Sequence, residues 1–233
     1  LEDVDRLLAP PATPHSQDDQ SCHGKIRTRA LICAAQIAAF YGDFKHAIDC
    51  LSIPEPCDRL LASNIQLELG AIYARTGQLQ SAYQCFEKIH HWICDPSGRE
   101  ELRVTASAHL QCGLSLFRER QLPLAKECYL KALELSGRLS VPTKVQADAH
   151  RYLGILYNAE GNNQEALREH QKALRVYFDL KLQIGQAKTY SSIGQSWLDL
   201  ARLEEALFFT HKAERISRRL GAEAEVAAIY GKL

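Results

Sequence analysis

The sequence predicts an all-α fold, a right-handed superhelical solenoid of stacked helix–turn–helix hairpins. Two observations lead to this prediction: apolar residues recur at intervals of three and four, the helical period, and the whole pattern repeats along the chain. Four copies align on a glycine and a fifth on an alanine. These anchor residues are Ala35, Gly70, Gly113, Gly154 and Gly194, spaced 35, 43, 41 and 40 residues apart.

Small residues return at fixed distances from the anchors. Twelve residues after the anchor, every copy carries alanine, and nineteen after it the last three copies do so again. Only small side chains let two antiparallel helices approach closely, and a large residue three positions after most anchors is expected to fill the space beside them. The alanines are Ala47, Ala82, Ala125, Ala166 and Ala206, then Ala132, Ala173 and Ala213.

Short polar breaks separate the two helices of each copy. Gly42, Gly77 and Gly161 follow their anchors by seven residues, where a helix can end in the left-handed conformation that residues with a Cβ avoid. Arg120 and Ala201 replace glycine in the other two copies. The pattern predicts helices over 26–41 and 44–52 and hairpins over 58–93, 100–138, 142–179 and 183–219.

The five alanines and four glycines at constant offsets resemble the tetratricopeptide repeat (TPR) family over roughly residues 26–220. Three of the four steps exceed the ~34 residues of the usual repeat. Such long repeats look like the subclass in Pins/LGN and rapsyn-type scaffolds, and kinesin light chain and bacterial peptide-sensing regulators also use them. The chain departs from the family in lacking the tryptophan early in the first helix, and from LGN-type grooves in lacking their flanking asparagines.

This resemblance implies a non-catalytic scaffold or adaptor that binds a peptide of a partner protein. The alternative is a sensor or regulatory domain of a larger signalling or transcription-regulating protein. In the family, six offsets on the first helix line a concave groove. Applied here, they predict a groove of Arg29, Phe40, Asn64, Glu68, Arg75, Gln111, Phe117, Arg118, Asp148, Arg151, Tyr152, Asn158, Lys188 and Gln195.

Arginines with aromatic residues between them suit a partner segment that is acidic and apolar. Under this interpretation, charge reversal at Arg118 and Arg151 weakens binding without lowering thermal stability. The alternative is that several of these arginines pair with acidic residues of the next repeat and hold the solenoid together.

Composition divides the chain into three parts: residues 1–21 as an N-terminal segment and flexible linker, 22–220 as the solenoid, and 221–233 as a partial sixth repeat or capping helix. The linker prediction rests on the Pro-, Ser-, Gln- and Asp-rich stretch 10–21. Residues 1–9 are acidic and apolar, and either dock in the basic groove in cis or form a frayed end or half of another repeat. Because the chain contains no Met, we expect an excised fragment.

Charge and cysteine usage exclude several function classes. The 28 Lys+Arg balance 28 Asp+Glu, so nucleic acid is not an expected partner, and no apolar run reaches the ~18 residues of a membrane span. The eight cysteines include no Cys-x-x-Cys pair, which favours reduced thiols in the cytoplasm or nucleus. Cys50, Cys85 and Cys128 share one register and are interpreted as packing residues. No enzyme motif is present, and we expect no catalytic residue, metal or cofactor.

Overall fold

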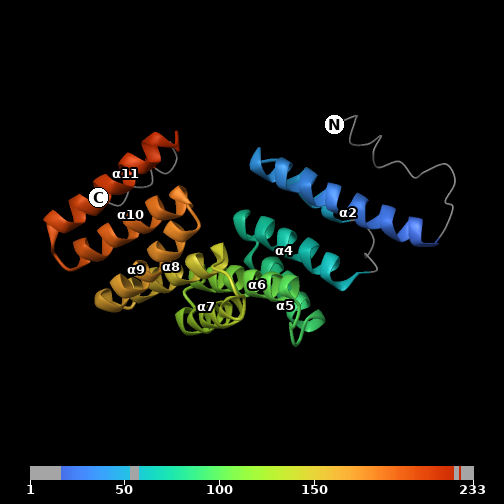
Figure 1. Ribbon diagram of the computed structural model, residues 1–233, viewed down its shortest axis with the longest axis horizontal. Helices are drawn as coiled ribbons and strands as arrows, with labels where there is room; N and C mark the ends of the chain where they lie inside the picture. The colour runs from blue at the N-terminus through green and yellow to red at the C-terminus, as the bar shows by residue number, and fades with distance from the viewer. Residues whose placement is uncertain (1–16, 53–57, 223–225, 227–233) are drawn as a thin grey trace. The chain divides into compact units, whose positions relative to one another are not determined.

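The computed structural model describes residues 17–52, 58–222 and 226, whose helices are labelled in Figure 1. This described part is built from helices without a strand, which confirms the predicted all-α fold class. The helices are α2 (Gln17–Phe40), α3 (Phe44–Leu51), α4 (Arg59–Arg75), α5 (Leu79–Trp92), α6 (Arg99–Arg118), α7 (Leu122–Gly137), α8 (Lys144–Ala159), α9 (Asn163–Asp179), α10 (Gln183–Asp199) and α11 (Leu203–Arg219).

The chain divides into two compact units, Leu1–Pro96 and Ser97–Leu233, where the sequence led us to expect one solenoid over 22–220. In unit 1, α2 pairs with α3 and α4 with α5. In unit 2, the pairs are α6 with α7, α8 with α9 and α10 with α11. Within each unit, the second helix of one pair contacts the first helix of the next, and in unit 2 α6, α8 and α10 also contact each other in succession. This is how consecutive repeats of a solenoid pack.

Helix α2 starts earlier than the sequence predicted. It begins at Gln17, so residues 17–21, which we had assigned to a flexible linker, are helical. The linker prediction came from the prolines of this stretch, but the last of them, Pro14, precedes Gln17, and no helix-breaking residue follows it before the helix. The prediction for residues 1–9, and that for the segment 221–233 apart from residues 221, 222 and 226, lie outside the described residues.

Local capping explains several helix starts. Asp43 accepts a hydrogen bond from the backbone N–H of His46 at 3.1 Å, and Asp58 accepts one from that of Leu60 at 2.9 Å. The hydroxyl oxygen of Thr143 accepts from the N–H of Gln146 at 3.2 Å. Each bond satisfies an N–H that has no partner within its helix, so α3, α4 and α8 begin where the sequence supplies a cap.

The turns inside the hairpins adopt the left-handed conformation that the sequence predicted. Gly42, Gly77 and Gly161 have φ values of 85°, 82° and 80°. Arg120 and Ala201, which replace glycine, adopt the same conformation with φ values of 61° and 57°. The hairpin therefore imposes the left-handed backbone conformation even on residues with a Cβ, which normally avoid it.

Replacing Ala201 by glycine is therefore expected to raise the free energy of unfolding by about 1 kcal/mol. A residue with a Cβ pays ~1–2 kcal/mol in this conformation, and part of the gain is offset by the greater freedom of unfolded glycine. Glu119→Gly is the matched control, because Glu119 has a φ of −78°, where glycine should cost ~0.5–1 kcal/mol. Urea denaturation of both variants measures the effect, and a loss of stability in Ala201→Gly would contradict the argument.

Inside each hairpin, the anchor faces the second helix at very close range. A Cβ built on Gly70 would lie 2.4 Å from the ring of Phe86, and one on Gly154 would lie 2.4 Å from the ring of His170. The five alanines twelve residues after the anchors are fully buried, as predicted. The residue that fills the space beside the anchor, however, is the one sixteen positions after it. These contact residues are Phe86, Tyr129, His170 and Thr210.

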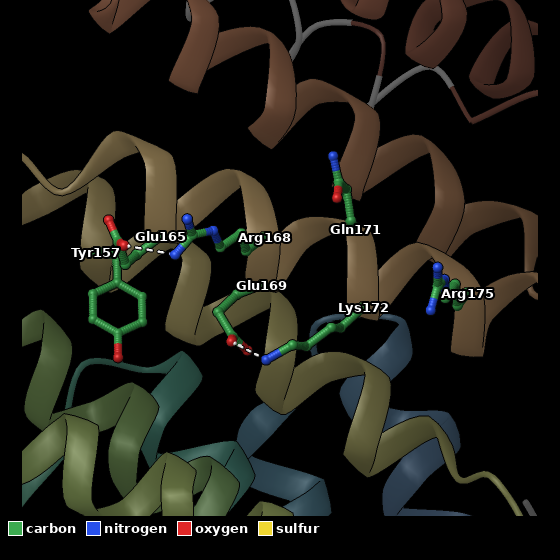
Figure 2. A pocket seen from close by; sticks show the side chains of 7 residues that line it. All are labelled: Tyr157, Glu165, Arg168, Glu169, Gln171, Lys172 and Arg175. Carbon is green, nitrogen blue, oxygen red and sulfur yellow. Dashed lines mark hydrogen bonds and ion pairs between the residues drawn. The ribbon is translucent and has the colours of Figure 1, made fainter.

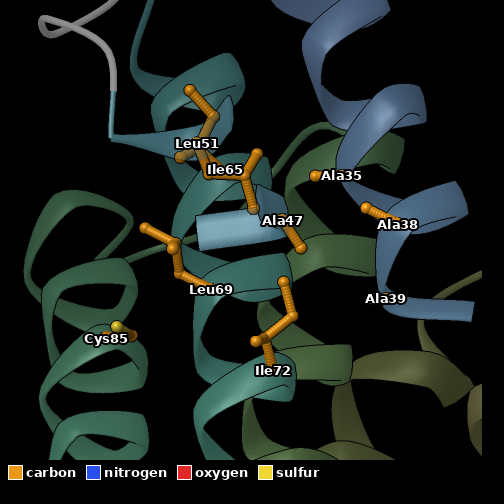
Figure 3. Close-up of a cluster of buried hydrophobic side chains, with 9 residues drawn as sticks. All are labelled: Ala35, Ala38, Ala39, Ala47, Leu51, Ile65, Leu69, Ile72 and Cys85. Carbon is orange, nitrogen blue, oxygen red and sulfur yellow. The ribbon is translucent and has the colours of Figure 1, made fainter. Parts of the chain in front are cut away.

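The sequence had assigned that space to the large residue three positions after the anchor. That residue belongs to the anchor's own helix, whereas the residue sixteen positions on projects from the opposite helix toward the gap. In unit 1, the small residues Ala35 and Ala47 join Leu51, Ile65 and further apolar residues in one buried cluster (Figure 3). The close approach of the helices therefore depends on a small residue meeting a large one across the hairpin.

Candidate functional site

The first helices of unit 2 carry most of the predicted groove residues. Because α6, α8 and α10 contact each other in succession, residues at equal offsets from the three anchors form rows across them. All of the residues concerned are half-buried or exposed. We call this set the first-helix face: Gln111, Phe117, Arg118, Asp148, Tyr152, Asn158, Lys188 and Gln195.

Polar contacts tie this face together. The Asn158 side-chain amide donates a hydrogen bond to Ser196 Oγ at 2.8 Å, which joins α8 to α10. Ser196 itself is fully buried. Within α10, the Gln195 amide donates to Asp199 Oδ1 at 2.8 Å. Asn158 therefore holds two neighbouring repeats in register, in addition to reaching the first-helix face.

Arg151 is the main departure from the predicted groove. Its side chain is buried, with 8% of its surface exposed, and its guanidinium lies 4.1 Å from the centre of the Tyr152 ring. It also lies 3.8 Å from Asp148 Oδ1, to which the Tyr177 hydroxyl donates a hydrogen bond. We call these four residues, Asp148, Arg151, Tyr152 and Tyr177, the Arg151 cluster.

The cluster keeps Arg151 charged although it is buried. Burial opposes the positive charge, but Tyr152, Tyr177 and Asp148 together raise the pKa of Arg151 above its ordinary value. Burial and the negative charge of Asp148 raise the pKa of Tyr177, which stays neutral and donates its proton in the hydrogen bond. Arg151 therefore acts as an internal cation whose partners belong to α8 and α9.

The burial of Arg151 has a positional cause. It stands three residues before its anchor, and the residues at the same offset in the neighbouring repeats, Leu110 and Ser191, are also buried. This offset therefore points into the packing of unit 2 and not onto its surface. For this reason we expect charge reversal at Arg151 to lower stability, in contrast to the expectation from the sequence.

In unit 1, the predicted groove residues fall into two groups. Arg29 and Phe40 are exposed, Phe40 to 80% of its surface. Glu68 accepts a hydrogen bond from the side-chain amide of Gln36 at 2.7 Å, and Arg75 donates to the carbonyl oxygen of Ala39 at 3.1 Å. Both bonds join α4 to α2. These bonds link consecutive repeats, but neither is the pair of an arginine with an acidic residue that the alternative interpretation expected.

The remaining predictions in unit 1 concern Asn64 and the surroundings of Arg75. Asn64 donates a hydrogen bond to the carbonyl oxygen of Leu60 within α4 at 2.9 Å. The guanidinium of Arg75 lies 5.0 Å from the centre of the Phe44 ring on α3. Of the predicted residues in this unit, Arg29, Phe40 and Arg75 are exposed, whereas Asn64 and Glu68 are half-buried.

The structure also contains a pocket that the sequence reasoning missed. It has a volume of about 420 Å³ and lies along the second helix of the fourth repeat (Figure 2). Arg168 pairs with Glu165 at 3.0 Å, and Lys172 pairs with Glu169 at 2.6 Å. The pocket is lined by Tyr157 of α8 and by Glu165, Arg168, Glu169, Gln171, Lys172 and Arg175 of α9.

The charges of this pocket largely satisfy each other. Glu169 also lies 2.7 Å from His150 Nδ1 of α8. Although burial works in the opposite direction, hydrogen bonds from His150 and Lys172 lower the pKa of Glu169. The Glu-x-x-Arg and Glu-x-x-Lys spacings in α9 were the available sequence signal, because residues three apart are neighbours on a helix. The pocket is therefore a network of ion pairs more than an open binding site.

Two further kinds of site were sought in the described part of the chain. There, no group of three or more His, Cys, Asp or Glu side chains is arranged to hold a metal ion. None of the described helices combines the length and apolar character that crossing a lipid bilayer requires.

Comparison with known proteins agrees with the repeat pattern. A tetratricopeptide repeat family model matches residues 104–179, which span most of α6 through α9. The chain is 26% identical over 217 residues to Protein KINESIN LIGHT CHAIN-RELATED 1 of Arabidopsis thaliana, covering 84% of this chain and 34% of that protein. It is 33% identical over 122 residues to Tetratricopeptide repeat protein 29 of Trypanosoma brucei brucei, covering 51% of this chain and 25% of that protein.

The chain thus spans about a quarter to a third of the length of these curated relatives. Among solved structures, BtubC (BKLC) from P. vanneervenii is similar, with a TM-score of 0.72 and 18% identity over 94% of this chain and 87% of that one. At this identity, the likeness concerns the fold. The segment 104–179 thus matches the tetratricopeptide repeat family, and the hairpins and fully buried alanines on either side of it repeat the same pattern.

Proposed function

We propose that this chain is a non-catalytic protein-interaction module that holds a peptide segment of a partner on the first-helix face of unit 2. The tetratricopeptide fold supports a role in protein–protein interaction. The observation that carries the finer proposal is the succession of α6, α8 and α10, which places Gln111 beside Tyr152 in one row of equal offset, and Phe117 beside Asn158 in another. Such a row matches the periodic side chains of an extended or helical peptide.

The charges of the first-helix face favour an acidic segment. Its carboxylate Asp148 already accepts a hydrogen bond from Tyr177 and lies near Arg151. The cations Arg118, which is exposed, and Lys188, which is half-buried, belong to α6 and α10 on either side of α8. Two cations against one carboxylate give this face a net positive charge, which attracts a partner with negative charge.

The apolar part of the partner would meet aromatic side chains. Phe117 and Tyr152 are half-buried, so each presents part of its ring to solvent. Tyr152 is held in place because its ring stacks on the fully buried Tyr129, with ring centres 5.8 Å apart and planes inclined by 15°. A rigid, partly exposed aromatic ring is the kind of anchor that contributes most to peptide affinity. The favoured partner is therefore a segment with alternating acidic and apolar residues.

The test begins with selection of binders from a random peptide library on the intact chain, followed by fluorescence anisotropy with a selected peptide. We expect enrichment of acidic and apolar residues, and about tenfold weaker binding for each of Arg118→Glu and Lys188→Glu. Arg175→Glu is the matched control, because Arg175 is exposed on α9 and outside the first-helix face. It should change affinity less than twofold.

Two results would overturn the assignment. One is a set of selected peptides without enrichment of acidic residues. The other is a loss of affinity in Arg175→Glu that equals or exceeds the loss in Arg118→Glu. Circular dichroism melting of all three variants verifies that they remain folded, which is expected because each substituted side chain is exposed or half-buried.

A further inference from the structure

Two cysteines of the third repeat lie next to each other across the hairpin of α6 and α7. Their Sγ atoms are 3.9 Å apart. The backbones are also close, because a Cβ built on Gly113 would lie 3.1 Å from the Cβ of Cys128. A disulfide requires a sulfur separation of about 2.05 Å, so an approach of the two sulfurs by roughly 2 Å would join Cys112 and Cys128.

This pair is peculiar to the third repeat. Cys112 immediately precedes its anchor, and Cys128 follows the anchor by fifteen residues. In each of the other copies, at least one of these two positions holds a residue without a thiol. The corresponding pairs are Ala34 with Cys50, Leu69 with Cys85, Leu153 with Glu169, and Ile193 with Phe209. Packing alone therefore does not require two thiols at these positions.

The surroundings make Cys128 the more reactive of the two. Cys128 is half-buried, whereas Cys112 is only 4% exposed. A hydrogen bond with Cys112 lowers the pKa of Cys128, and His109 and Lys131 lower it further, although burial acts in the opposite direction. In contrast, burial raises the pKa of Cys85, which occupies the same register in the second repeat. The thiolate is the reactive form of cysteine.

We propose that Cys128 and Cys112 form an oxidisable dithiol, a modification site for hydroperoxides. In the first step, the Cys128 thiolate attacks one oxygen of the peroxide and the O–O bond breaks. Cys128 becomes a sulfenic acid, and the second oxygen leaves as water or alcohol after taking up a proton. Cys112 then attacks the Cys128 sulfur, and the S–O bond breaks. The departing hydroxide takes the Cys112 proton as water, so two thiols reduce one peroxide.

The product is a disulfide that links α6 to α7 within one hairpin. A cross-link of this kind restricts the unfolded chain and so stabilises the folded hairpin. Cys112 is adjacent in sequence to Gln111 of the first-helix face, so oxidation would fasten the α6 segment that carries this residue. The dithiol itself does not depend on what that face binds.

The test uses the full reduced chain exposed to equimolar hydrogen peroxide, quenched by alkylation and mapped by mass spectrometry without reduction. We expect the peptide pair linked through Cys112 and Cys128 to form at least tenfold faster than Cys94 is oxidised. Cys94 is the internal control because its thiol is exposed on the same chain. Oxidation of Cys94 at an equal or faster rate, or linkage of Cys128 to a different cysteine, would overturn the proposal.

Two isosteric variants separate the steps. In Cys112→Ser, the sulfenic acid on Cys128 has no resolving partner and should accumulate, so that dimedone labels Cys128. In Cys128→Ser, Cys112 should remain reduced, and the rise in melting temperature that we expect on oxidation of the wild type should be absent. Absence of the dimedone label from folded Cys112→Ser would refute the assignment of Cys128 as the attacking thiol.

Discussion

Phe86→Ala is expected to lower the free energy of unfolding by about 3–5 kcal/mol. Phe86 is fully buried in unit 1, and its ring occupies the space directly over Gly70. Truncation would leave a cavity between α4 and α5, because the ring fills the space between Gly70 and the backbone of α5. Urea denaturation followed by circular dichroism measures the loss.

A double-mutant cycle tests the contact between Gly70 and Phe86 directly. Gly70→Ala in the wild type should cost about 1–3 kcal/mol, because the new methyl group would lie 2.4 Å from the Phe86 ring. In the Phe86→Ala background that clash is absent, and the preference of alanine for the helix should stabilise the protein by about 1 kcal/mol. The double-mutant cycle should therefore show a strong coupling.

Gly137→Ala provides the control for this cycle. Gly137 lies at the end of α7, where an added Cβ would meet no atom within 4 Å. This substitution should raise the free energy of unfolding by up to ~1 kcal/mol through helix preference alone. Additive effects of Gly70→Ala and Phe86→Ala would show that the close approach at the anchor is not what holds the hairpin.

Arg151→Glu is expected to have the second large effect, a loss of about 3–5 kcal/mol in the free energy of unfolding. The substitution removes a buried cation and places a second carboxylate beside Asp148, which then keeps the Tyr177 hydroxyl and the exposed Lys144, 4.0 Å away, as its partners. An unpaired buried charge is among the most costly changes a fold can receive. The measurement is again equilibrium denaturation.

Arg118→Glu is the matched control for Arg151→Glu. The exposed Arg118 should tolerate charge reversal with a change within about 0.5 kcal/mol. Arg151→Met removes the charge while retaining much of the side-chain volume, and it should cost less than Arg151→Glu. If Arg151→Glu were as mild as Arg118→Glu, Arg151 would be a surface residue, as its offset in the family pattern implied.

The spacing of residues in the sequence was sufficient to predict the hairpins, their turns and the small residues at the helix contacts. These features follow from local rules: the helical period sets which residues share a face, a Cβ disfavours the left-handed turn, and a side chain cannot occupy the space of an approaching backbone. Gly42, Gly77 and Gly161 were therefore predictable from spacing alone, as was the burial of the alanines.

Which residues of a second helix lie against each helix face depends on tertiary packing. Spacing places Arg151 on a side of its helix, but the presence of Tyr177 and Asp148 there depends on how α8 packs against α9. The same holds for Cys112 and Cys128, which are sixteen residues apart in the chain but 3.9 Å apart at their sulfurs. A helical period describes directions around one axis, and the neighbour found in a given direction is set only when a second helix packs there.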